Sequence, residues 1–115
     1  MTDRELLELA AKAAGIKVKG YFEDEPTLLI KPGIRLPPAR WNPLTDDGDA
    51  LRLAVKLKID FYIGDDDGIA TYAGYFYPSI NNRQRFAIER HENSGPYAAT
   101  RRAIVRAAAS IGGEL

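Results

Sequence analysis

A chain of 115 residues has the usual length of one domain, and we expect a single domain over residues 1–115. The absence of cysteine excludes thiol chemistry and any Cys-ligated zinc site. Sixteen basic residues balance sixteen acidic ones, and no apolar run reaches the length of a membrane span. The start of the chain, MTDRELLELAAKAAG, is acidic and unlike a signal peptide, so we expect a cytoplasmic protein that does not enter the membrane.

Charge is spread unevenly along the chain. Residues 46–67 hold seven aspartates against three basic residues, a net charge of −4, and residues 81–106 hold six arginines against two glutamates, a net charge of +4. Such a dipolar layout could steer a charged partner. The simpler interpretation, which we prefer, is that the two regions neutralise one another across the fold.

The first predicted element is a helix at the start of the chain. Thr2 and Glu5 have the spacing of a capping box, in which each side chain satisfies a free backbone N–H of the first turn. Gly15 stands where a left-handed residue commonly ends a helix. Between them, apolar residues recur at helical spacing, namely Leu6, Leu9, Ala10 and Ala13.

Two strands and a proline-rich loop should follow this helix. Residues 16–22 alternate between apolar side chains and lysine or tyrosine, which is the period of a strand with one wet face. The EDEP segment turns the chain, and TLLIK at 27–31 can return as a second strand. Residues 32–43, PGIRLPPARWNP, contain four prolines and predict a stiff surface loop that leads to the second helix.

The second helix should begin at Thr45 or Asp46, both common N-cap residue types. The last helix should begin after Ser94, because Gly95 and Pro96 suit a helix entry, and Gly112 should end it. The expected apolar stripe of the second helix is Leu51, Ala54, Val55 and Leu57, and the expected buried side of the last helix is Tyr97, Ile104, Val105, Ala108 and Ile111.

Between these helices the sequence predicts further strands. KIDFYI at 58–63 carries its apolar residues on one side, and GDDDG at 64–68 forms a turn. IATYAGYFYP at 69–78 is apolar on both faces, which is typical of a central strand. SINNRQ at 79–84 turns the chain again, and RFAIERHE at 85–92 alternates as one more strand. The order of elements indicates an α+β domain with three helices and a mainly antiparallel sheet of about four or five strands.

The segment WNPLTDDGDALRLAVKL at 41–57 has two interpretations. Carboxylates at the positive end of a helix are favourable, so Asp46, Asp47 and Asp49 are explained as a decorated helix start. Trp41 either pins the proline-rich loop to the core, which we prefer, or stands out as a contact anchor. A hard-cation site shared with residues 65–67 lacks the ligand spacing of a calcium loop, so we expect no metal and no cofactor.

Two other groups of residues are candidate sites. His91 is the only histidine, and no serine or cysteine is spaced to form a hydrolytic triad with it, so no catalytic residues are predicted. Arg101, Arg102 and Arg106 on the last helix offer a basic face that could bind nucleic acid, as in the final helix of double-stranded-RNA-binding domains. Arginines on a wet helix face more often serve solubility, and we place nucleic acid second.

Three blocks of the sequence together resemble a family of small phage and prophage proteins described as a phage ABA-sandwich domain. The blocks are TDRELLELAAKAAG at 2–15, WNPLTDDGDALRLAVKL at 41–57 and PYAATRRAIVRAAASIG at 96–112. A more distant likeness is to the NinX-type phage proteins, through the Trp-Asn-Pro segment at 41–43. The resemblance implies a three-layer α/β/α sandwich, with a two-layer α+β fold as the alternative, and it implies no reaction.

The function expected from the sequence is therefore that of a phage- or prophage-type accessory protein. It should act by binding, without catalysis, and the partner should be another protein of the phage or the host. Nucleic acid is the second possible partner, and an enzyme of unrecognised class is the third possibility. The expected protein-binding residues are Trp41, Asn42, Pro43, Asp46, Asp47 and Asp49.

Overall fold

The computed structural model describes residues 1–64, 70–77, 82–92 and 94–115. Within these residues the fold is α+β, with three helices and two separate three-stranded antiparallel sheets. This confirms the α+β class and the antiparallel pairing, but the expected single sheet of four or five strands is wrong. The elements are α1 (Asp3–Ala14), β1 (Lys17–Tyr21), β2 (Leu28–Lys31), β3 (Ala39–Trp41), α2 (Asp47–Leu57), β4 (Asp60–Ile63), β5 (Ala70–Tyr77), β6 (Asn82–Arg90) and α3 (Pro96–Gly112).

The helix ends follow the local signals in the sequence. The Thr2 hydroxyl accepts a hydrogen bond from the backbone N–H of Glu5, and the Glu5 carboxylate accepts one from the backbone N–H of Thr2. Gly15 closes α1 with a φ of 70°, in the left-handed region that glycine adopts without steric cost. Asp46 is the N-cap of α2, and Gly95 precedes Pro96 at the start of α3, as predicted. The helix α3 continues through Gly112, the residue that we expected to end it.

The first sheet has the order β1-β2-β3. Strands β1 and β2 confirm the predicted pair around the EDEP turn, with Lys17 opposite Lys31. Residues 39–41 form the edge strand β3, so the prediction of a loop throughout 32–43 is wrong at its end. Pro37 and Pro38 lie just before β3, so their missing N–H groups remove no hydrogen bond from the pairing of β3 with β2.

The second sheet has the order β4-β5-β6, which confirms β5 as a central strand. A register shift between Ala73 and Gly74 marks a bulge in β5 where it pairs with β6. Strand β6 begins at Asn82, inside the segment that the sequence assigned to a turn, because residues 82–84 continue the pairing with the end of β5. Most of the predicted GDDDG turn, residues 65–68, lies outside the described residues.

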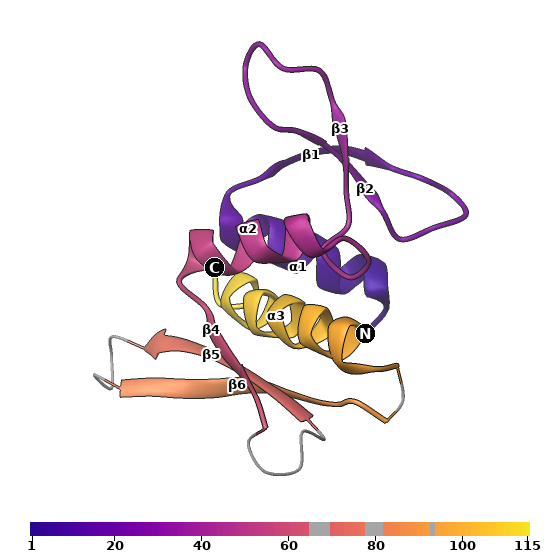
Figure 1. Cartoon of the computed structure of the whole chain (residues 1–115). Coiled ribbons are helices and arrows are strands. Elements are labelled where there is room, and N and C mark those ends of the chain that lie inside the picture. Colours follow the sequence, from indigo (N-terminus) through magenta and orange to yellow (C-terminus); the bar gives the residue numbers. More distant parts are fainter. Residues whose placement is uncertain (65–69, 78–81, 93) are drawn as a thin grey trace.

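Helix α3 is the centre of the molecule. It packs against β5 and β6 on one side and against α1 and α2 on the other, and the first sheet lies beyond α1 and α2 (Figure 1). Eight of its 17 residues are buried, and five of these are alanines. Small side chains all around a helix let neighbours approach from several directions. The helices therefore lie between the two sheets, and the expected sandwich with helices on both outer faces is not the arrangement found.

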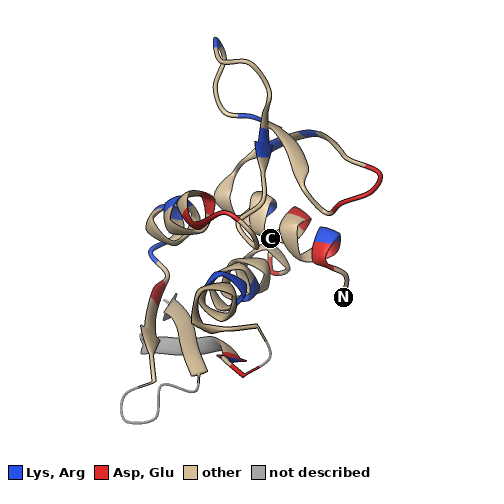
Figure 2. Ribbon diagram, turned by 45° about the vertical axis from the view of Figure 1, so that its right-hand side comes forward, with Lys and Arg blue, Asp and Glu red and all other residues tan. Residues whose placement is uncertain are grey.

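Charged residues are distributed over both halves of the molecule (Figure 2). The acidic region 46–67 and the basic region 81–106 meet at α2 and α3, where Arg101 Nη1 lies 2.7 Å from Asp47 Oδ1. This contact agrees with the expected neutralisation of the two regions. Among the described residues, no helix combines the length and apolar character needed to cross a membrane.

Candidate functional site

The Trp-Asn-Pro segment is buried. Trp41 is 4% exposed, Asn42 is 7% exposed, and Pro43 is among the most deeply buried side chains. Asn42 donates from Nδ2 to the Thr27 hydroxyl at 3.1 Å and accepts from the backbone N–H of Leu44 at 3.0 Å. The segment thus joins the first sheet to α2, and the interpretation of Trp41 as a packing residue is confirmed. The role of these three residues in protein binding stays a prediction, and they offer little surface for it.

The three aspartates of the same segment have different surroundings. Asp46 caps α2 by accepting from the backbone N–H of Asp49 at 2.8 Å. Asp49 is largely shielded, because one oxygen accepts from the Asn42 backbone N–H and the other lies 2.8 Å from Arg52. Asp47 remains 73% exposed despite its contact with Arg101. Asp46 and Asp47 are consequently the two carboxylates of this segment that a partner could reach.

The arginines of α3 each face a carboxylate. Arg101 donates to Asp47 and, through Nε, to the Leu44 carbonyl at 2.8 Å. Arg102 lies 3.0 Å from Asp3, and both Arg102 and Arg106 approach Glu89. An arginine engaged in this way must exchange a carboxylate for a phosphate, which reduces the net gain from binding nucleic acid. The geometry therefore gives these residues a role in holding α3 to its neighbours.

His91 takes part in a short chain of hydroxyl contacts that the sequence did not predict. Its Nε2 lies 2.8 Å from the hydroxyl of Thr71, which lies 2.8 Å from the hydroxyl of Thr100. Thr71 is fully buried, so its hydroxyl is satisfied within the protein and closed to a substrate. These hydroxyl and imidazole contacts link β5, the residue that follows β6, and α3. The residues in contact are 20 and 29 positions apart, a separation that no local pattern reveals.

In the described part of the chain, the other candidate catalytic and metal-binding side chains do not come together. Ser110 donates to the Arg106 carbonyl within its own helix, and Ser79 lies outside the described residues. Within the described ranges, no three His, Cys, Asp or Glu side chains are grouped so that they could hold a metal ion. Residues 65–67, the other half of the cation site considered from the sequence, fall in an undescribed range.

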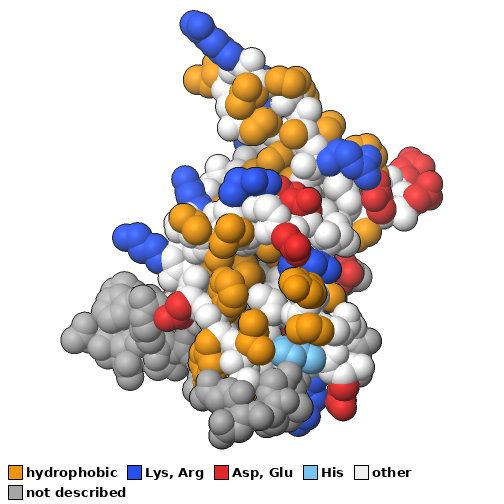
Figure 3. All heavy atoms as spheres, in the orientation of Figure 1, with side chains coloured by type: hydrophobic (Ala, Val, Ile, Leu, Met, Phe, Trp, Pro, Cys, Tyr) orange, Lys and Arg blue, Asp and Glu red, His pale blue; other side chains and the backbone are white. Residues whose placement is uncertain are grey.

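An apolar groove lies where α2, β4 and the first turns of α3 meet. Its volume is about 470 Å³, which is within the range of small binding sites. Large apolar side chains stand exposed along it, with Leu51 57% exposed and Tyr97 75% exposed. Figure 3 shows hydrophobic side chains gathered across this face, between α2 and the second sheet. The apolar residues that line the groove are Ala50, Leu51, Phe61, Ile63, Pro96, Tyr97 and Ile104.

Two residues of the groove, Leu51 and Tyr97, were expected to face the core. Of the predicted apolar stripe of α2, Ala54 is buried, whereas Leu51 and Val55 are exposed, and α2 buries Ala50 and Leu53 beside Ala54. Tyr97 was assigned to the buried side of α3 and is exposed. These three predictions are wrong because the apolar side chains of α2 and of the first turn of α3 extend beyond the surface that neighbouring elements cover.

No protein-family model, curated protein or solved structure matches this chain.

Proposed function

We propose that this protein acts by binding another protein, without catalysis, and that the apolar groove between α2, β4 and α3 is its contact surface. The observation that carries the proposal is the cluster of exposed large apolar side chains around the groove. Exposed apolar side chains scattered singly are normal, but a contiguous group around a concavity is typical of an interaction site. Aromatic anchors such as Tyr97 and Phe61 are frequent among the residues that dominate binding energy.

The groove also indicates what a partner should look like. Asp47 lies at its border, and Asp46 is exposed at the same end of α2. A partner segment with two or three apolar side chains and a flanking lysine or arginine would fill the groove and face these carboxylates. On the opposite border, β4 is an edge strand of the second sheet, and all four of its residues are exposed. The edge of a sheet is a common docking position for an extended partner segment, which would run beside β4.

From the sequence resemblance alone, we propose that this binding serves a phage or prophage, with the protein in the role of an accessory protein. The alternative of a nucleic-acid-binding protein has less support, because the three arginines on which it depends already face carboxylates. An enzyme of unrecognised class has less support still, because His91 does not line the groove.

The proposal is tested by crosslinking in host cells that carry the phage or prophage. A photoreactive phenylalanine analogue replaces Tyr97 in one variant and Ile34 in another. Ile34 is a matched control, because it is an apolar residue that is 93% exposed but belongs to the loop before β3, away from the groove. We expect a protein crosslink from position 97 and none from position 34.

A second variant ties the crosslink to the groove. Adding Leu51→Asp should weaken the crosslink at position 97 at least about tenfold, since burying a leucine side chain contributes about 1.5–3 kcal/mol. Because Leu51 is exposed, the substitution should leave the thermal midpoint almost unchanged. Equal crosslinking from positions 97 and 34, or a crosslink indifferent to Leu51→Asp, would contradict the proposal. A crosslink to nucleic acid in place of protein would favour the alternative.

A further inference from the structure

The loop between β2 and β3, residues 32–38, projects from the body of the molecule (Figure 1). Its tip is a turn in which the backbone N–H of Leu36 donates to the Gly33 carbonyl at 3.3 Å. Ile34 and Arg35 occupy the two central positions of this turn. Ile34 is 93% exposed and Leu36 is 56% exposed, so the tip presents two large aliphatic side chains to solvent. Figure 3 shows hydrophobic side chains gathered at this end of the molecule.

Prolines flank the tip on both sides. Pro32 precedes the turn, and Pro37 and Pro38 follow it. A proline ring fixes φ near about −65°, so this part of the loop has little backbone freedom left to lose on binding. A segment that is already ordered binds at a lower entropic cost than one that must fold on its partner. The tip is therefore a preorganised contact element.

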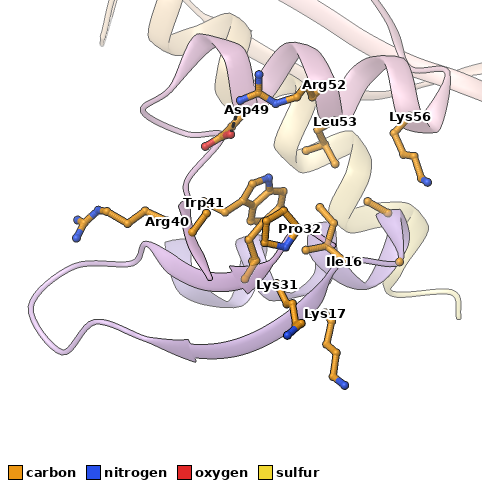
Figure 4. Close-up of a pocket in the computed structure, with 14 residues that line it drawn as sticks. Ile16, Lys17, Lys31, Pro32, Arg40, Trp41, Asp49, Arg52, Leu53 and Lys56 are labelled. Carbon is orange, nitrogen blue, oxygen red and sulfur yellow. Dashed lines mark hydrogen bonds and ion pairs between the residues drawn. The ribbon is translucent and has the colours of Figure 1, made fainter. Parts of the chain in front are cut away.

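Cations accompany the loop at its tip and at its base. Arg35 is at the tip (Figure 2), Lys31 is the last residue of β2, and Lys17 is the register partner of Lys31 at the start of β1. The two lysines leave the same face of the first sheet, and Figure 4 shows both pointing away from Trp41. None of the three cations lies within ion-pair distance of a carboxylate in the described part of the chain.

The first sheet is polarised along its length. The turn between β1 and β2, at the end opposite the loop, carries Glu23, Asp24 and Glu25. Figure 2 shows this acidic turn well apart from the basic residue at the tip of the loop. Near an anionic surface, such a charge distribution turns the loop end toward the surface and the acidic turn away from it. The charges therefore favour the orientation in which the aliphatic tip meets the surface first.

We propose that this loop and the two lysines at its base dock the protein on an anionic lipid bilayer. Ile34 and Leu36 enter the boundary between headgroups and acyl chains, and Arg35, Lys17 and Lys31 lie beside the anionic headgroups. A bilayer suits this surface better than a nucleic acid, because a phosphate backbone offers the aliphatic tip nothing to bury against. The sequence led us to expect a protein that does not enter the membrane, and docking at the surface needs no membrane-spanning segment. The docking surface is separate from the apolar groove and does not depend on the function proposed for the groove.

The first test measures cosedimentation of the full chain with two kinds of vesicle. One kind consists of phosphatidylcholine alone, and the other of phosphatidylcholine and phosphatidylglycerol in equal amounts. We expect reversible binding to the anionic vesicles and little to the neutral ones. Binding should weaken as salt is added, because salt at about 0.1 M screens charges beyond about 10 Å. Equal binding to both kinds of vesicle, or none to the anionic kind, would overturn the proposal.

Matched variants separate the tip from the cations. Ile34→Ser should weaken binding to anionic vesicles at least about tenfold through the loss of a buried aliphatic side chain. It should leave the thermal midpoint unchanged, because Ile34 is exposed. Lys17→Gln and Lys31→Gln should each weaken binding about fivefold. Arg90→Gln, which removes an exposed cation from the second sheet, and Leu51→Asp in the groove should leave binding unchanged. Vesicle binding that is indifferent to Ile34→Ser would contradict the docking model.

A label at the tip reports whether it enters the bilayer. The chain has no cysteine, so Ile34→Cys provides a single attachment site for the environment-sensitive dye nitrobenzoxadiazole, and Tyr97→Cys at the apolar groove provides the control. With anionic vesicles, the emission of the dye at position 34 should rise and shift to shorter wavelength, and that at position 97 should not. An unchanged emission at position 34 would mean that the tip stays in water. A protein crosslink from position 34 in host cells would mean that the tip contacts a protein. Either result would rule out the bilayer as its partner.

Discussion

The contact between α1 and α3 can be tested at a single glycine. Gly112, at the end of α3, lies so close to α1 that a Cβ atom on it would stand 1.9 Å from the Leu9 carbonyl oxygen and 2.7 Å from the Leu9 carbonyl carbon. Both atoms belong to the backbone of α1, so no side-chain rotation relieves the clash. In Gly112→Ala the two helices must separate until the Cβ to oxygen distance exceeds 3.0 Å.

The cost follows from what this separation disturbs. Leu7, Ala10 and Ala11 of α1 are fully buried in the same interface, and a shift of the helix opens gaps around them. Overpacking a well-packed core typically costs about 1–3 kcal/mol and occasionally more. Here the clash is with backbone, so we expect about 3 kcal/mol, the upper end of that range. For a domain of about 100 residues this lowers the thermal midpoint by about 10–20 °C.

Gly113→Ala is the matched control. The next glycine has a φ of −68°, and a Cβ there would stand 3.5 Å from its nearest neighbour, which is ordinary contact. Alanine should be neutral or stabilise by about 0.4–1 kcal/mol at such a position. Urea unfolding, followed by Trp41 fluorescence and by far-ultraviolet circular dichroism, measures both variants. A Gly112→Ala protein within about 0.5 kcal/mol of the parent would refute the close packing of α1 on α3, since surface substitutions have effects of that size.

Three further predictions concern local hydrogen bonds. Asp46→Ala removes the cap of α2 and should lower the unfolding free energy by about 1 kcal/mol in urea, whereas Asp46→Asn should retain most of it. Asn42→Ala leaves the Thr27 hydroxyl without its buried donor and should cost about 1–3 kcal/mol by the same measurement. Hydrogen bonds from the Thr2 backbone and hydroxyl lower the pKa of Glu5, so Thr2→Ala should raise that pKa toward its ordinary value in an NMR titration. A carboxyl group with a lowered pKa stabilises the folded state when the pH is above the ordinary pKa, and this stabilisation is lost as the pH falls through the lowered pKa. Thr2→Ala should therefore also make the free energy of unfolding less dependent on pH in the acid range.

The parts of the fold that the sequence predicted correctly depend on neighbours in the chain. The capping box at Thr2 and Glu5, the cap at Asp46 and the entry at Gly95 and Pro96 each involve residues at most three positions apart. Such signals are complete within the segment that carries them. The strands at 28–31 and 60–63 were also predictable from their apolar pattern.

The parts that failed depend on what lies across the fold. Helical spacing places the apolar residues Leu51 and Val55 on one face of α2. Whether another element covers that face depends on where β4 turns away from α2. Likewise, residues 39–41 form a strand because they pair with β2. The prolines just before them favour a loop, so the sequence pattern alone did not predict this strand. The division into two sheets has the same origin, since the helices pack between β1-β2-β3 and β4-β5-β6, and no local pattern reveals on which side of a helix a strand will lie.

The segment from Trp41 to Asp49 lies between two concave surfaces. On one side Trp41 lines a cleft between α2 and the first sheet (Figure 4), and on the other Asp47 borders the apolar groove. Helix α2 carries this division further, because Leu53 lines the cleft and Leu51 lines the groove. Substitutions at sites with no shared partners have additive effects. Leu51→Asp should therefore leave the fluorescence emission maximum of Trp41 unchanged, because Leu51 lines the groove and Trp41 lines the cleft. If Leu51→Asp instead shifted the emission maximum of Trp41, α2 would have to move as a unit, and the two surfaces could no longer be treated as separate.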